Sequence, residues 1–377
     1  KQTDRQTDKK IKKCFFGIGN VLLNNVLDKN VQRMFFPLNL TQRLFLSSKY
    51  NISDNFITPN SLKFNIASFG GVLAIISLYV YRMVTIKSEG NIGARTSKLF
   101  YFINLFSVYF YCCGYILIFV QNVIYGSSNV SLVLIIQRVY KSVKFNKNKI
   151  ITFVIFSWIS VITTMGISVS IFLYSYLSRN DFNTINFITG FTFLTFDMNM
   201  VYGIRVMVLI RELLVSWIEK LRVVNEQAKS WSDIFEEYDN ILKAYALYMK
   251  LYQAIVSFHS FFSHCFIIFY TNLLNTVLLQ FLTCIWDTKD LMLQIVQSLE
   301  CGTFYRYIEE ADNACIVHLM NGQYTKRRVC KNIMRLKQAS FGKMTACGVF
   351  TVDVTFPVAM VSLLSNYTIV LLQFAFL

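Results

Sequence analysis

The sequence predicts an all-α membrane protein with seven transmembrane helices, a cytoplasmic N-terminus and an extracellular C-terminus. Hydrophobic residues make up 54% of the 377 residues, and the mean hydropathy is +0.45, which is far too apolar for a soluble surface. Apolar segments long enough to cross a bilayer recur along the chain. The basic residues responsible for the net charge of +16 lie mainly between these segments. They do not form part of a recognisable nucleic-acid-binding fold. We therefore expect a multi-pass protein of the plasma membrane, surrounded by lipid, with no nucleic-acid partner.

The first 62 residues are expected to form a cytoplasmic N-terminal region. Residues 1–14 are charged and repetitive, so we do not expect them to belong to the fold. Farther along, apolar clusters such as Met34-Phe35-Phe36 alternate with basic residues. This pattern is typical of an amphipathic helix at a membrane surface.

Residues 63–343 are predicted to form a six-helix sensing and anchor region. The six predicted spans are 64–81, 99–125, 150–177, 185–210, 255–286 and 291–308. We expect a tight turn at 287–290 and a sixth span that is short and polar, so that it either borders an aqueous cavity or is incomplete. Acidic and basic residues alternate through 211–253, which favours helical extensions that pack together outside the bilayer.

The distribution of charge between the spans predicts the orientation. The loop at 126–149 carries five basic residues and no acid, and the loop at 313–343 carries seven and no acid. The turns at 178–184 and 287–290 are neutral or slightly acidic, and only residues 82–98 oppose the pattern. Because cytoplasmic loops are enriched in Lys and Arg, the N-terminus is predicted inside and the C-terminus outside.

Residues 344–377 are predicted to contain the last span, which carries no charge between Val354 and Phe374. Its polar residues Thr355, Ser362, Asn366 and Gln373 fall within roughly 40° of one another on a helical wheel. A polar stripe on a spanning helix faces protein or water rather than lipid. Two interpretations are open on this pattern alone, hydrogen bonding between helices and the lining of a pore.

No motif in the chain indicates catalysis, so we expect that the protein is not an enzyme and has no cofactor. The nine cysteines and three histidines show no spacing typical of a metal site. The histidines also have no matching group of carboxylates in the sequence, and no metal ligand is predicted.

The end of the last span resembles the signature of the insect gustatory receptors, relatives of the insect odorant receptors. Tyr367 is followed by five apolar or small residues and then by Gln373-Phe374. The segment 345–356 and the pair Glu310-Ala311 are also similar to the family pattern. The resemblance implies a ligand-gated, non-selective cation channel for small-molecule tastants. It also implies a homo- or hetero-tetramer with other gustatory receptor subunits, whose central pore is lined by the last helix and whose last helix breaks near Pro357.

The resemblance assigns expected roles to residues of the last helix. Gln373 and Phe374 form or flank the gate, Val370 and Ile369 lie one turn below, and Asn366 and Ser362 line the path inward. Aromatic and polar residues of the second to sixth spans are candidates for a ligand pocket: Tyr174, Thr189, Asp197, Gln280, Trp286 and Gln294. Asp197 is the foremost of them, because a carboxylate at membrane depth needs a partner or water.

A seven-helix metabotropic chemoreceptor of the G-protein-coupled type is the alternative. The predicted inward N-terminus argues against it, as does the lack of its usual motifs after the third span and in the seventh. A transporter is disfavoured because the sequence shows neither internal repeats nor pairs of Gly- or Pro-broken helices.

Overall fold

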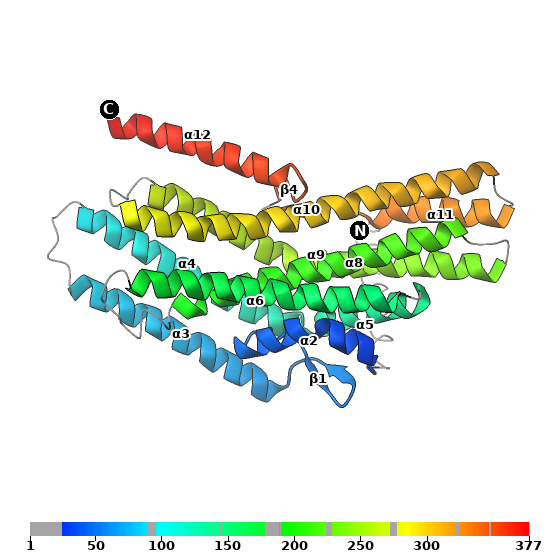
Figure 1. Ribbon diagram of the computed structural model, residues 1–377, viewed down its shortest axis with the longest axis horizontal. Helices are drawn as coiled ribbons and strands as arrows, with labels where there is room; N and C mark the ends of the chain where they lie inside the picture. The colour runs from blue at the N-terminus through cyan, green and yellow to red at the C-terminus, as the bar shows by residue number, and fades with distance from the viewer. Residues whose placement is uncertain are drawn as a thin grey trace, which may run out of the picture.

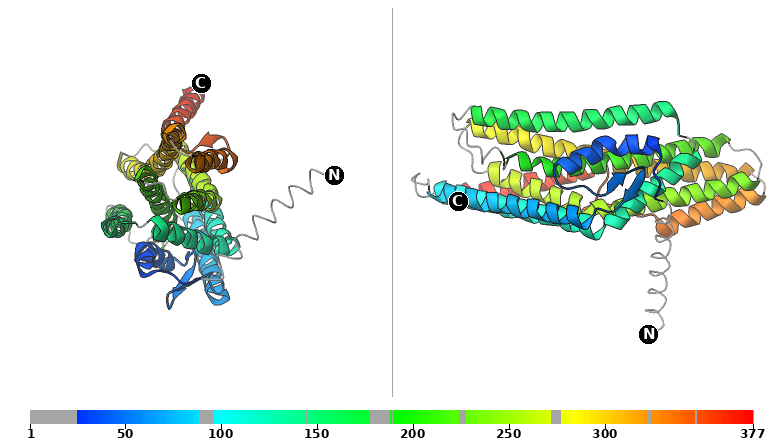
Figure 2. Two further views of the ribbon diagram at one scale, coloured as in Figure 1. Left: turned by 90° about the vertical axis from the view of Figure 1, so that its right-hand side faces the viewer. Right: turned by 90° about the horizontal axis from the view of Figure 1, so that it is seen from below.

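The protein is an elongated bundle of long helices that run close to its long axis (Figure 1). The computed structural model describes residues 25–88, 96–143, 145–177, 188, 190–223, 228–271, 277–321, 324–346 and 348–376. Two short antiparallel hairpins are the only sheets in these ranges. The end-on view shows the helices gathered around one another, with α12 (Phe356–Phe376) projecting from the bundle (Figure 2).

Two helices have the length and composition of membrane spans. They are Leu62–Val84 within α3 (Leu62–Ser88) and Lys147–Tyr174 within α6 (Lys147–Leu177), and they coincide with the first and third predicted spans. A third candidate is the bent pair Val108–Ile124 and Gly126–Val143, whose axes differ by 66°. These counts cover the described residues alone, and the full set of seven spans stays a prediction.

The expected loop at 126–149 is largely a helix, so that prediction is wrong. Helix α4 (Thr96–Ile124) is followed by α5 (Gly126–Val143), which packs against α8 and α9. The apolar run from Val130 to Ile136 is buried, whereas Arg138 and Lys141 are exposed. The prediction weighed only the basic residues, but these occupy the outer face of an amphipathic helix.

Three helices form the centre of the bundle: α8 (Leu194–Val223), α9 (Ala228–Thr271) and α10 (Val277–Asn321). They have 30, 44 and 45 residues, which at about 1.5 Å per residue gives lengths of roughly 45, 66 and 68 Å. Since a bilayer core is about 30 Å thick, α9 and α10 extend well beyond one. In the charged stretch 211–253, residues 211–223 lie on α8 and 228–253 lie on α9, so the described residues are helical as expected.

The sixth predicted span needs a correction, because α10 passes without interruption through the expected turn at 287–290. Helix α9 ends at Thr271 and α10 begins at Val277, so the predicted fifth span is too long and the helix that contains the sixth extends well beyond 291–308. A turn was expected because residues 287–290 are mostly charged, and charged residues are usually exposed to water. In the structure Lys289 and Asp290 are buried, and helical neighbours supply their partners.

The distal half of the central helices has its own core, built around Trp217, Trp231 and Tyr238, which are all fully buried. The Trp217 indole N–H donates to the Ile234 carbonyl oxygen at 3.0 Å, which joins α8 to α9. Helix α11 (Tyr324–Ser340) packs on α9 and α10. Ion pairs such as Arg222–Glu310 lie at the surface of this part.

The N-terminal region contributes α2 (Lys29–Leu44) and the hairpin of β1 (Asn51–Ser53) and β2 (Phe56–Thr58), in which Ile52 pairs with Ile57. The Asp28 carboxylate caps α2 by accepting the Asn30 amide N–H at 2.8 Å. Helix α2 is amphipathic as expected. Its apolar side packs onto α6 and α8, with Val31, Met34 and Phe35 buried.

The ends of the helices alternate between the two ends of the molecule. Helices α3, α6, α9 and α12 end, and α4 and α10 begin, at the left in Figure 1, where the C-terminus lies. Helices α8 and α10 end, and α9 and α11 begin, at the right. Consecutive spans alternate in this way whichever terminus lies inside, so the orientation stays a prediction.

A buried lysine joins the N-terminal region to three helices of the bundle. The Lys49 ammonium donates to Asn199 Oδ1 at 3.0 Å and Asn122 Oδ1 at 3.5 Å. It also lies over the rings of Tyr202 and Tyr252, 5.4 and 5.3 Å from their centroids. Amides and aromatic faces attract a cation, yet they do not replace its hydration. Burial therefore lowers the pKa of Lys49 to about 7.

We expect the protein to become more stable as the pH rises from about 7 toward 10.5. In this window the unfolded chain holds a proton on Lys49 that the folded protein has released, so unfolding takes up a proton. The free energy of unfolding should increase by about 1.4 kcal/mol per pH unit. Thermal unfolding of the purified protein at pH 7.5 and 9.5 measures the effect. Lys49→Met should flatten the increase, whereas Lys63→Met, at an exposed lysine, should not.

Candidate functional site

A buried ion pair connects three helices in the apolar half of the bundle. Asp197 lies in the first turn of α8, and its Oδ2 atom accepts from the Lys289 ammonium of α10 at 2.5 Å. The ammonium also lies 3.4 Å from the Ser168 hydroxyl oxygen of α6. Only 3% of the Asp197 side chain and 6% of the Lys289 side chain are exposed. The pair satisfies the requirement that a charge among apolar helices has a partner.

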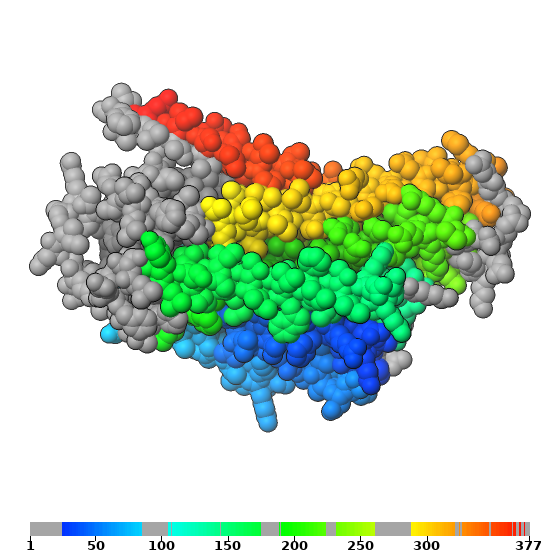
Figure 3. Space-filling view, viewed as in Figure 1, coloured from blue at the N-terminus to red at the C-terminus, as the bar shows by residue number. Residues whose placement is uncertain are grey.

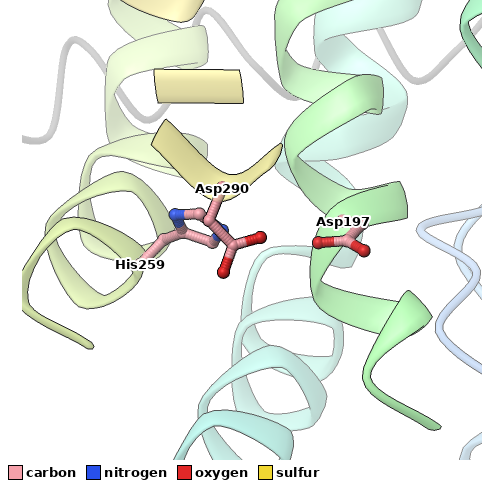
Figure 4. Close-up of side chains that lie close together, drawn as sticks. All are labelled: Asp197, His259 and Asp290. Atoms are coloured by element: carbon pink, nitrogen blue, oxygen red, sulfur yellow. The ribbon is translucent and has the colours of Figure 1, made fainter. Parts of the chain in front are cut away.

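A second carboxylate and a histidine complete this buried cluster. Asp290 Oδ1 lies 3.3 Å from the Lys289 ammonium, and His259 of α9 contacts Gln294, whose amide nitrogen is 3.2 Å from the ring Nδ1. An amide N–H can only donate, so His259 Nδ1 is the acceptor there. Figure 4 shows His259 beside Asp290, with Asp197 facing them from α8.

The cluster contradicts the expectation that the histidines lack a carboxylate group. Asp197, His259 and Asp290 each present one ligand atom, and these atoms lie within 4.8 Å of one another. They are residues that could hold a metal ion. However, the Lys289 ammonium already lies against both carboxylates. Two carboxyl groups thus face one ammonium in an apolar setting.

The space beside the cluster is small and walled by aromatic rings. Its volume is about 20 Å³, and its walls include Tyr111, Phe193, Phe196 and Phe258. The rings of Tyr111 and Phe193 lie 3.9 Å apart between centroids. Such a volume holds about one water molecule. A larger molecule can bind beside Asp197 only when the surrounding rings or helices move.

The structure brings two of the six predicted pocket residues together. Asp197 and Gln294 both belong to the cluster, joined through His259. Tyr174 lies on α6 with 47% of its surface exposed and is not among the described residues around this space. Thr189 and the side chains of Gln280 and Trp286 lie outside the described part of the chain.

Sequence reasoning missed Lys289, Asp290 and His259 as members of the site. The signal was present, because Asp197 was expected to need a partner at membrane depth. Residues 277–300 also form one helix once the charges at 287–290 are allowed inside it. Lys289 would then have been the natural partner for Asp197.

The other candidate residues lie on α12, which packs on α9 and α10 along the edge of the molecule (Figures 1 and 3). The five predicted pore residues whose side chains are described are all exposed: Ser362, Asn366, Ile369, Val370 and Gln373. The side chains of Tyr367 and Phe374 lie outside the described residues. The five exposed residues lie within about 100° of one another around the helix axis, so they share one face.

One member of the predicted polar stripe does not belong to it. Thr355 precedes α12, and its backbone N–H and its hydroxyl both donate to Asp353 Oδ1, at 2.9 and 2.6 Å. The Thr355 carbonyl oxygen accepts the Ala359 amide N–H at 3.0 Å at the start of the helix. Pro357 occupies the first turn, where its missing N–H costs no hydrogen bond. The exposed face of α12 therefore starts at Val358.

The segment before α12 is fixed to the central helices. It contains the hairpin of β3 (Thr345–Ala346) and β4 (Phe350–Thr351). The Met344 amide N–H donates to the hydroxyl oxygens of Tyr245 and Tyr305, at 3.2 and 3.0 Å. Gly302 of α10 allows a close approach, because a Cβ atom there would lie 3.1 Å from the Val354 backbone nitrogen and 2.6 Å from its side chain.

The long helices, the spans and the charged cluster within the bundle define a polytopic helical membrane protein. Its fold is similar to that of the insect olfactory receptor OR5 from Machilis hrabei, whose structure was determined in complex with eugenol. The TM-score is 0.55, with 13% identical residues over 91% of this chain and 97% of that one. No family model matches the chain, and no curated protein matches it. The likeness establishes the fold.

We expect Asp197→Asn to destabilise the protein by about 3–5 kcal/mol, because it removes the nearer of the two carboxylates that face the buried Lys289 ammonium. Thermal unfolding of the full chain in detergent measures this loss. Combining Asp197→Asn with Lys289→Met should recover much of it. Lys243→Ala, at an exposed pair with Asp239, should cost less than about 1 kcal/mol. Strictly additive losses in the double variant would contradict the pairing.

Proposed function

We propose that the chain is a gustatory receptor subunit, a ligand-gated, non-selective cation channel that opens in response to small-molecule tastants. In this proposal four subunits, identical or mixed, surround one pore, and the chain is neither an enzyme nor a holder of a cofactor. The observation that carries the proposal is the exposed face of α12.

The exposed face of α12 suits a pore better than a lipid contact. It alternates aliphatic side chains with polar ones that include Ser362, Asn366 and Gln373. Lipid would leave these amides and hydroxyls without hydrogen bonds, whereas water or a second subunit would satisfy them. Because α12 packs on α9 and α10 on one side only, four copies can place these faces around a common axis. Rings of Ile369 and Val370 would then close the path by excluding water.

The charged cluster supports a sensing role for the rest of the bundle. Its carboxylates, its histidine and its aromatic walls combine the few polar groups and the apolar surface that small-ligand sites share. The similar olfactory receptor was determined with a small aromatic molecule bound. We transfer from it only the class of ligand, a small organic molecule. The closed cavity at Asp197 is then the resting form of the site.

The pore assignment predicts that Gln373→Ala changes permeation. Replacing the amide by a methyl group removes polar groups that hydrate ions near the outer end of the path. We expect severalfold smaller agonist-evoked currents in cells that express the chain with the partner subunits it requires. Ser365→Ala is the matched control, because that hydroxyl donates within its own helix to the Val361 carbonyl oxygen at 3.0 Å. Equal currents in all three proteins would reject the role of α12.

The orientation can be tested with two single substitutions that create glycosylation sites. Gly93→Ser places a sequon at Asn91, between α3 and α4, and Gln227→Ser places one at Asn225, between α8 and α9. With the N-terminus inside, the first protein should gain a glycan and the second should not, as read from a mobility shift that glycosidase removes. The reverse pattern would place the N-terminus outside and favour a metabotropic receptor of the G-protein-coupled type.

A further inference from the structure

A second and larger cavity lies apart from the charged cluster, in the half of the bundle nearer the N-terminal region. Its volume is about 190 Å³. The segment 44–47 at the end of α2 forms one wall, α3 and α4 form two others, and the start of α8 closes it. Among the described residues, none that the sequence predicts as a site residue lines it.

The volume of this cavity sets the size of what it can hold. An engineered apolar cavity of about 150 Å³ binds benzene, which has six heavy atoms. By proportion, 190 Å³ accommodates a molecule of about eight heavy atoms. The cavity beside Asp197 is roughly a tenth of this volume, so the larger space is the one that is already open to a small ligand.

The walls of the cavity select for a mainly apolar ligand with one hydrogen-bond donor. Ile75, Ile118 and Phe119 provide apolar surface. The Ser68 hydroxyl donates to the Leu46 carbonyl oxygen, and its own oxygen keeps the capacity to accept. The Asn122 side chain is held by the protein itself: its amide nitrogen donates to the Ser47 carbonyl oxygen at 2.9 Å, and its Oδ1 accepts from the Lys49 ammonium at 3.5 Å. An alcohol of a single ring matches this combination.

The edge of the cavity is formed by exposed apolar side chains. Leu44 and Leu46 are 68% and 41% exposed. Leu46 has a φ of 52°, a left-handed conformation at the end of a helix where glycine is favoured. The Leu46 side chain is thus held beside Gly71 at a conformational cost, and a Cβ atom on Gly71 would lie 2.7 Å from its Cδ1. An apolar edge admits ligands from the lipid phase.

The two cavities share a wall. Thr195 and Tyr115 line the larger one, whereas Phe196 and Asp197 line the smaller one. The rings of Tyr115 and Phe196 meet edge to face, 5.0 Å apart between centroids. A molecule in the larger cavity would therefore press on the same turn of α8 that carries the buried ion pair.

We propose that this cavity, between residues 44–47, α3, α4 and the start of α8, is a binding site for a small monocyclic alcohol that enters from the lipid phase. The site is separate from the charged cluster, and its occupancy can be measured whether or not the chain conducts ions.

The test uses the full chain in detergent micelles and 3-fluorobenzyl alcohol as the probe. Fluorine NMR linewidths report the bound fraction, and excess benzyl alcohol reveals how much of it is saturable. Ile75→Trp fills the cavity and should weaken saturable binding at least tenfold. Leu73→Trp adds the same side chain to an exposed position of α3 that does not line the cavity, and it should bind as the wild type does. Ser68→Ala should weaken binding severalfold.

Either of two results would overturn the proposal: no saturable binding to the wild type, or wild-type binding by Ile75→Trp. Equal loss in Leu73→Trp would also overturn it, because the effect would then not arise in the cavity. If Ile75→Trp does not fold, as judged by its thermal unfolding, Gly71→Ala replaces it. That change displaces the Leu46 side chain, and it too should weaken saturable binding.

Discussion

The mismatch between the length of the central helices and the thickness of a bilayer governs this structure. Helices α9 and α10 have 44 and 45 residues, about twice the number needed to cross a bilayer core. A helix of this length that crosses a bilayer has about half of its residues outside the lipid, where they need other partners. The distal core around Trp217 and Trp231 provides it, with α5 and α11 packed on the same helices. The half of the bundle with the charged cluster and the half with the distal core are thus built on the same two helices, α9 and α10.

The buried ion pair has a different role from the apolar packing around it. Apolar contacts between helices tolerate sliding and rotation, whereas a carboxylate and an ammonium at 2.5 Å do not. The pair fixes the register of α8 against α10, and Ser168 extends the contact to α6. Lys49 supplies a comparable polar anchor where the N-terminal region meets α4, α8 and α9. Asp197 lines the smaller cavity, and Lys49 contacts Asn122, which lines the larger one. The polar contacts that fix the helices are therefore next to both cavities.

The sequence predicted elements well where one physical signal dominated. Long apolar runs located α3 and α6, and alternating charge located the helical residues 211–223 and 228–253. It failed where two signals conflicted. The charges at 287–290 resembled a turn, although they are buried and paired inside α10. The basic residues of 126–149 resembled a loop, although Arg138 and Lys141 lie on the outer face of α5 and Lys147 and Lys149 lie in the first turn of α6.

The candidate site was predictable only in part, for the same reason. Asp197 was identified from its position in an apolar run, but Lys289 and Asp290 are recognisable only once α10 is known to be continuous. His259 lies 31 positions before Asp290, and nothing local links the two. Their meeting depends on how α9 folds back against α10. The larger cavity depends on a fit between side chains from four separate segments, which leaves no pattern in one sequence.

The continuity of α10 has a mechanical consequence. Asp290 and Gly302 are twelve positions apart on this helix, a distance of about 18 Å along its axis. A rigid rod that tilts by about 5° about one of these points displaces the other by roughly 1.5 Å. At Gly302 there is no slack to absorb such a displacement, because the Val354 backbone lies directly against it and Tyr305 holds the Met344 amide. A tilt of α10 at Asp290 would therefore displace the segment that precedes α12.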